Sequence, residues 1–130
     1  MIEFNGWLTI CSDSDELDII AQDKKLIADV ENILREFKTQ NQLCEIKMIN
    51  GFVNLFIGGG HNHDNGYSDD LLKILQEICQ IASRSFGIIY VRWPEHEIHW
   101  NQYKVYQIAK GIITVKDDVY LSPCNPVIED

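Results

Sequence analysis

The sequence predicts an α+β fold, a largely antiparallel sheet with two helices packed on one of its faces. Two stretches carry a single apolar stripe at helical spacing, which indicates helices that each bury one side. Around them lie strand-like segments, four of which are joined in pairs by the turn dipeptides Asn50-Gly51 and Lys110-Gly111. The expected order is βαββαβββ, and 130 residues, 45% of them hydrophobic, fit a single domain spanning residues 1–130.

The first strand is expected over residues 2–11, with Trp7 serving the fold rather than a binding site. A helix follows, roughly over residues 15–37. Asp13 can cap its first free amides and Glu16 stands three residues further on, as in a capping box. The apolar stripe that this helix should bury consists of Ile19, Leu26, Val30, Ile33, Leu34 and Phe37.

Residues 43–57 read as a hairpin, because Asn50-Gly51 best tolerates the positive φ values of a type I′ turn. Pairing Ile49 with Phe52 then gathers six apolar side chains on one face, namely Cys44, Ile46, Met48, Val53, Leu55 and Ile57. The second face is partly apolar through Ile49, Phe52 and Phe56, which belong either to the core or to a contact surface.

The second helix is expected over residues 68–85, with Ser68 as its cap. Its buried stripe is Leu71, Leu75, Ile78 and Ala82, broadened by Ile74, Cys79 and Ile81. Strands follow at residues 86–92, 103–109 and 112–116. A turn at Lys110-Gly111 sets Tyr106 beside Val115 and Ile108 beside Ile113.

The C-terminal segment, Leu121 to Asp130, is stiff and half apolar. Pro123 and Pro126 each fix φ near −65°, so ordering this segment costs less backbone entropy. Val127 and Ile128 then offer apolar side chains for docking. We expect a strap that lies on the body of the protein.

The charge of the chain bounds its partners and its compartment. The net charge is −9, from 20 acidic and 11 basic side chains, which argues against binding to nucleic acid or to an anionic membrane. A basic protein partner remains attractive. The start of the chain lacks a targeting pattern and no window is apolar enough to span a bilayer, so we expect a cytoplasmic protein. The four cysteines are widely spaced, without a CxxC pair, and should be reduced and mostly buried thiols.

A catalytic set is not apparent in the sequence. Gly58-Gly59-Gly60 is expected in a loop, but it lacks the GxxxxGK[ST] pattern and no helix follows it directly, which disfavours a nucleotide site. No GxSxG is present, and Ser122 has no identifiable base. We therefore expect no enzyme activity and no cofactor.

Two histidine pairs form the basis of a competing interpretation, a small metal-dependent hydrolase. His61 and His63 make one pair, His96 and His99 the other, and four converging imidazoles could hold one ion, with a neighbouring glutamate as the base. The second pair does not match HExxH, because its histidines are three residues apart. The sequence therefore favours no metal site.

The stretch from Arg92 to Asn101 is the favoured binding region. It combines tryptophan with charged side chains, the composition of interface hot spots. An acidic turn after the last strand extends this surface. The candidate contact residues are Trp93, Glu95, His96, Glu97, His99, Trp100, Asp117, Asp118 and Tyr120.

Four strings of the chain together resemble the immunity protein 7 family of bacterial polymorphic toxin systems, nearly end to end. They are Asn5-Gly6-Trp7, Gly58-Gly59-Gly60-His61-Asn62-His63, Arg92-Trp93-Pro94-Glu95 and the C-terminal segment. The resemblance implies a small cytoplasmic antidote that binds and blocks one cognate toxin, frequently a nuclease. It brings no catalytic residues.

The hypothesis that follows is stoichiometric inhibition without turnover. An acidic surface that bears aromatic side chains would occlude the active or substrate-binding site of a basic toxin C-terminal domain. A third interpretation, beside the metal-dependent hydrolase, is an adaptor domain that recognises some other protein.

Overall fold

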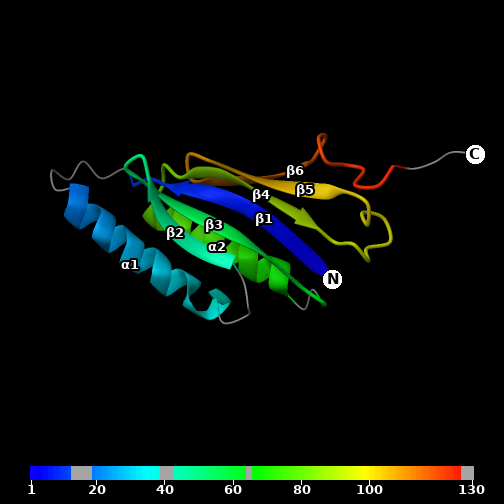
Figure 1. Ribbon diagram of the computed structural model, residues 1–130, viewed down its shortest axis with the longest axis horizontal. Coiled ribbons are helices and arrows are strands. Elements are labelled where there is room, and N and C mark those ends of the chain that lie inside the picture. Colours follow the sequence, from blue (N-terminus) through cyan, green and yellow to red (C-terminus); the bar gives the residue numbers. More distant parts are fainter. Residues whose placement is uncertain (13–18, 39–42, 64–65, 127–130) are drawn as a thin grey trace, which may run out of the picture.

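The computed structural model describes residues 1–12, 19–38, 43–63 and 66–126. These residues form two helices and six strands, shown in Figure 1. In chain order they are β1 (Ile2–Ile10), α1 (Ile19–Lys38), β2 (Leu43–Ile49), β3 (Phe52–His61), α2 (Tyr67–Ile81), β4 (Phe86–Arg92), β5 (Tyr103–Ala109) and β6 (Ile112–Asp117). The predicted α+β fold and the order βαββαβββ are confirmed.

The strands form one sheet in the order β2-β3-β1-β4-β5-β6, and each neighbouring pair is antiparallel. The first strand of the chain therefore lies inside the sheet, between β3 and β4. Both helices cover the same face, as predicted from their single apolar stripes (Figure 1). The other face is not covered by any element among the described residues.

β1 shows how the sequence sorts side chains between the two faces. Successive side chains of a strand point to opposite sides, and every second residue of β1 from Ile2 to Ile10, apart from Gly6, is buried on the helix side. These side chains meet the apolar stripes of the helices, chiefly Val30, Leu34, Leu71, Leu75 and Ile78. Each fully buried aliphatic side chain contributes roughly 1.5–3 kcal/mol.

Both predicted hairpins have the expected register. Ile49 lies opposite Phe52 across the Asn50-Gly51 turn, and Ile108 lies opposite Ile113 across the Lys110-Gly111 turn. All four turn residues have positive φ, between 51° and 81°, as a type I′ turn requires. Met48, however, lies on the predicted apolar face without being buried.

β3 is longer than predicted, because the glycine run is a strand and not a loop. Gly58, Gly59 and Gly60 pair with residues 3–5 of β1, and His61 pairs with Ile2. Glycine is disfavoured in strands, but pairing with the backbone of β1 keeps these three residues in β3. The ends of two other strands differ by one residue: β1 stops at Ile10 and β6 includes Asp117.

α2 begins and ends earlier than predicted. Its N-cap is Gly66, in the left-handed conformation, and Ser68 lies inside the first turn. The helix ends at Ile81, and Ala82 is the C-cap. Ile81 is 40% exposed, so its placement on the buried stripe was wrong. The expected start of the first helix, with Asp13 and Glu16, lies outside the described residues.

The four cysteines are free, as predicted, but only Cys79 is buried. The other three, Cys11, Cys44 and Cys124, are half-buried. Burial raises the pKa of the Cys44 thiol to about 11, an effect that nearby Lys38 reduces. This thiol is therefore protonated and weakly nucleophilic at neutral pH.

β1 and β4 approach each other closely at two glycines. A Cβ atom on Gly6 would lie 2.2 Å from the carbonyl oxygen of Ile88, and one on Gly87 would lie 2.1 Å from the carbonyl oxygen of Trp7. Both neighbours are backbone atoms of a central strand pair, which cannot swing aside as the end of a long side chain can. Only glycine fits at these two positions.

We therefore expect Gly6→Ala to lower the free energy of unfolding by about 2 kcal/mol or more, through overpacking between β1 and β4. Denaturant unfolding of both proteins measures the difference. Thr114→Ala, at an exposed position of β6, is the control and should change stability by less than about 0.5 kcal/mol. Equal stability of Gly6→Ala and wild type would contradict the packing argument.

Candidate functional site

The loop between β4 and β5 and the segment after β6 lie at the same end of the sheet (Figure 1). Buried Asn101 joins them, because its side-chain amide donates to the carbonyl oxygen of Asn125 at 2.9 Å and its side-chain oxygen accepts from the Asn125 amide at 2.8 Å. The Cys124 amide also donates to the carbonyl oxygen of Asn101, at 2.9 Å. Three hydrogen bonds thus fix one segment against the other.

Asp118 holds the start of the segment after β6. Its buried carboxylate accepts hydrogen bonds from the amides of Tyr120, at 3.1 Å, and Leu121, at 2.6 Å. The Asp118 amide donates to the Tyr103 carbonyl oxygen at 3.2 Å, and the Tyr103 amide donates to the Ser122 hydroxyl at 2.7 Å. The Asp118 carboxylate is therefore engaged inside the fold, where it shapes the chain.

Arg92, the last residue of β4, ties this end of the molecule to β1. Its guanidinium donates to the Glu3 carboxylate at 2.7 Å and lies 5.7 Å from the centre of the Tyr103 ring. The hydrogen bond to Cys124 raises the pKa of Arg92 the most, and the hydrogen bond to Glu3 is the second cause of this increase. One cation thus contacts three separate parts of the chain.

The nine predicted contact residues lie in the β4–β5 loop or at and after the end of β6, a region that we call the loop-end surface, although Asp118 itself is buried. They are Trp93, Glu95, His96, Glu97, His99, Trp100, Asp117, Asp118 and Tyr120. Trp100 is 48% exposed and Tyr120 is 87% exposed, so both present aromatic area to solvent. Trp93 is half-buried and packs against the core, which gives it a structural role.

The histidines and the acids of this surface contact nearby groups of the chain. The rings of His96 and His99 stack with centres 5.0 Å apart, and Nδ1 of His96 accepts from the amides of Ile98 and His99, each at 3.1 Å. Lys104 hydrogen-bonds Asp117 and, with a smaller effect of His99, lowers the pKa of that carboxyl. Glu95 pairs with the N-terminal amine at 3.5 Å, an exposed contact worth little.

The other histidine pair occupies a different environment. The His61 ring, at the end of β3, stacks on Tyr67 of α2 with centres 5.4 Å apart, and its Nδ1 lies 2.9 Å from the carbonyl oxygen of His63. Within the described ranges, no three His, Cys, Asp or Glu side chains lie together as metal ligands. The described geometry thus gives the hydrolase interpretation no ligand set.

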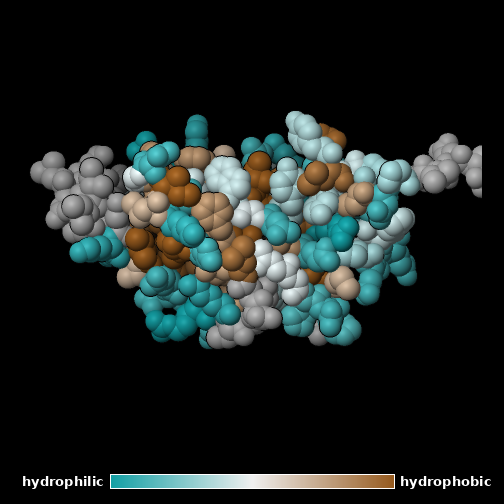
Figure 2. Space-filling view, in the orientation of Figure 1, coloured by the Kyte–Doolittle hydropathy of each residue, from teal (hydrophilic) through white to brown (hydrophobic). Residues whose placement is uncertain are grey.

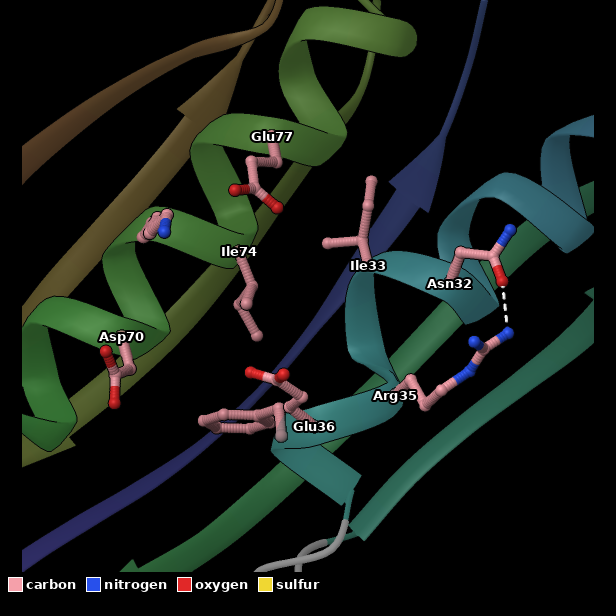
Figure 3. A pocket seen from close by; sticks show the side chains of 9 residues that line it. Asn32, Ile33, Arg35, Glu36, Asp70, Ile74 and Glu77 are labelled. Atoms are coloured by element: carbon pink, nitrogen blue, oxygen red, sulfur yellow. Dashed lines mark hydrogen bonds between the residues drawn. The ribbon is translucent and has the colours of Figure 1, made fainter.

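A hollow lies between the two helices (Figure 3). It has a volume of about 370 Å³, and Figure 3 shows Ile33 of α1 and Ile74 of α2 facing the gap, with the carboxylates of Glu36 and Glu77 beside them. It contains none of the predicted contact residues. Its open, mixed polar and apolar lining does not nominate a chemistry.

The open face of the sheet carries a feature that the sequence reading missed. Trp7 is part of β1, as expected, yet its side chain is 41% exposed on the face opposite the helices. It meets Phe86 of β4 edge to face, with ring centres 6.3 Å apart. Strict alternation from Leu8 and Phe4 would have placed Trp7 on this face, since those neighbours point into the core.

Comparison with known proteins gives one family. The sequence model of the family described as immunity protein 7 matches residues 1–130, the whole chain. No curated protein and no solved structure gives a match. Neither helix, over the residues that the structure describes, is long and apolar enough to cross a membrane.

Removing the side chain that joins the two segments tests how the loop-end surface is held. We expect Asn101→Ala to speed amide exchange at residues 124 and 125 and to cost about 1–3 kcal/mol locally, because it leaves Asn125 groups without their partner. Hydrogen exchange followed by mass spectrometry measures this. Asn62→Ala, at an exposed position, is the control, and equal exchange in both variants would show that Asn101 does not hold the segment.

Proposed function

The chain belongs to the immunity protein 7 family, and we propose that it binds one cognate toxin and neutralises it stoichiometrically, without catalysing a reaction. We propose that the toxin is the C-terminal domain of a polymorphic or contact-dependent effector. Nuclease activity is the first activity to test in that domain. The protein acts in the cytoplasm, where such a toxin reaches its target. Family membership supports the immunity role, and the identity of the toxin is the proposed part.

Charge supports a cationic partner. The chain carries −9, and a nuclease domain needs basic side chains to hold its polyanionic substrate. Opposite potentials speed encounter and disfavour wrong partners. An acidic antidote that covers the substrate-binding surface of such a toxin competes with the nucleic acid for the same cations.

The observation that carries the proposed contact site is the fixed geometry of the loop-end surface. Asn101 and Asp118 hold the β4–β5 loop and the chain after β6 in place through hydrogen bonds between 2.6 and 3.1 Å. Exposed Trp100 and the carboxylates of Glu95 and Glu97 are presented from this framework. A surface that is ordered before binding loses less entropy in the complex.

Co-expression tests the function directly. The protein is produced together with the effector domain encoded immediately upstream, and cell survival and copurification are scored at low and high salt. Survival with a copurifying complex supports immunity. Absence of both rescue and complex rejects that domain as the cognate toxin.

Two variants test the loop-end surface. We expect Trp100→Ala, and separately the double variant Glu95→Lys/Glu97→Lys, to weaken toxin binding at least about tenfold, as loss of a hot spot or of complementary charge does. The double variant should act mainly on the association rate, and its effect should shrink as salt rises. Binding kinetics on immobilised toxin at two salt concentrations measure both effects.

The matched control is Glu31→Lys/Glu36→Lys, which makes the same charge change at two exposed positions of α1. It should bind the toxin like wild type, apart from the loss of affinity that follows from a less negative net charge. Trp93→Ala is unsuitable, because Trp93 packs against the core and its removal also affects folding. If the Trp100 and glutamate variants fold and bind as tightly as wild type, the toxin lies elsewhere on the molecule.

A further inference from the structure

The uncovered face of the sheet carries an aromatic patch, which we define as Trp7, Phe56, Phe86, Ile88, Tyr90 and Tyr103. We propose that this patch is the apolar centre of the toxin-binding surface and that the loop-end surface is its acidic rim. The inference rests on the proposed function and specifies its partner. That partner is a protein surface with projecting apolar side chains next to a cluster of cations.

Strand register places the patch on one face. Phe56 of β3, Trp7 of β1 and Ile88 of β4 lie directly opposite one another across three neighbouring strands. Phe86 and Tyr90 flank Ile88 two residues away on β4, and two residues along a strand return to the same side. None of these side chains contributes to the core between the sheet and the helices.

Four rings of the patch pack against each other in two pairs, and the rings of one pair are exposed. Trp7 and Phe86 meet edge to face, and so do Tyr90 and Tyr103, whose centres are 5.9 Å apart. Trp7 is 41% exposed and Phe86 is 45% exposed. In Figure 2, brown and pale side chains lie among teal ones where β1, β3 and β4 run.

An aromatic surface of this kind is unusual for the outer face of an antiparallel sheet. Such a face is polar when water alone covers it, and contiguous apolar surface on a soluble protein marks an interaction site. Aromatic anchors that are already held by neighbouring rings lose little side-chain entropy on binding. The patch therefore has the properties of an interface centre.

Charge separates the patch from the rest of the molecule. Among the described strand residues, the open face carries two acidic side chains, Glu3 and Glu45, and three basic ones, Lys47, Arg92 and Lys116, a sum of +1. The whole chain carries −9, so its net negative charge comes from residues other than these five. The Glu3–Arg92 pair at 2.7 Å and the Glu45–Lys47 pair at 3.7 Å partly neutralise the face locally. An interface core is depleted of net charge in the same way.

The patch adjoins the two ends of the β4–β5 loop. Arg92 and Tyr103 lie opposite each other as the last residue of β4 and the first residue of β5, so the loop starts and ends beside the patch. The acids of the loop, Glu95 and Glu97, follow Arg92 by three and five residues, and both are exposed. This arrangement of apolar centre and acidic rim matches a partner with the opposite charge.

A second copy of the chain fits less well. Two chains of −9 repel each other, and stacking their open faces adds no compensating charge, because each face carries a small positive sum. A cationic toxin meets no such repulsion. Self-association of the protein is therefore an outcome that the experiment must separate from toxin binding.

The test uses two separate variants, Trp7→Ser and Phe86→Ser, with Ile81→Ser as the matched control. The exposed fraction of Ile81, 40%, is close to the 41% of Trp7. Ile81, however, lies on α2, on the opposite side of the sheet. Circular dichroism and thermal melting establish that each variant folds. Binding is measured on a catalytically inactivated form of the effector domain that wild type neutralises in cells.

We expect each patch variant to lose at least about tenfold in affinity, mainly through faster dissociation and with little change in salt dependence, whereas Ile81→Ser stays within about twofold of wild type. Hydroxyl-radical footprinting of the wild-type complex gives a readout that needs no variant, and Trp7 and Phe86 should be protected. The footprint decides the case if a patch variant fails to fold.

The outcomes are distinguishable. If wild type binds but the patch variants bind equally well, or Trp7 is not protected, the inference is wrong and the immunity role stands. If wild type neither rescues nor binds, the proposed function fails for that toxin and the inference falls with it. If the free protein is a dimer that Trp7→Ser dissociates, the patch belongs to a second copy instead.

Discussion

The alternation of side chains along β1 is the constraint on which the rest of the structure depends. Because β1 lies between β3 and β4, its hydrogen bonds fix both neighbours, and its inward residues set the position of the core. Phe4 and Leu8 contact the helix layer, while Trp7 between them is directed to the opposite face. A shift of one residue in register would exchange these roles, so that one strand determines both the core and the outer aromatic surface.

The close contact between β1 and β4 transmits that order to the loop end. Gly6 and Gly87 let the two backbones approach, and β4 then leads to Arg92, which contacts Glu3 on β1. Beyond Arg92 the chain leaves the sheet and returns at Tyr103. The irregular segments at this end are thereby connected to the most central strand pair, and their hydrogen bonds have a rigid base.

Local sequence signals were sufficient for the hairpins and insufficient for contacts between distant segments. The turn dipeptides determined the register of β2 with β3 and of β5 with β6, because positive φ at two consecutive residues leaves few alternatives. Gly58–Gly60 were misread, since their place in β3 comes from pairing with β1. The Asn101 hydrogen bonds to Asn125 span 24 residues, and no local pattern indicates them. The candidate contact residues lie at one end of the sheet, but Asp118 is buried and Trp93 packs against the core. Trp7 was assigned to the fold alone.

The two edges of the sheet have a consequence for the behaviour of the protein at high concentration. Edge strands offer unpaired backbone groups to any other strand, and two such edges allow sheets to join into ribbons. Here the edge strand β2 carries Glu45 and Lys47 on its outer face, and β6 carries Lys116 and Asp117 near its end. Joining of edges would bring these charges close together and desolvate them. The charged edge strands thus oppose fibril growth. Without them, the aromatic face of the molecule would favour aggregation.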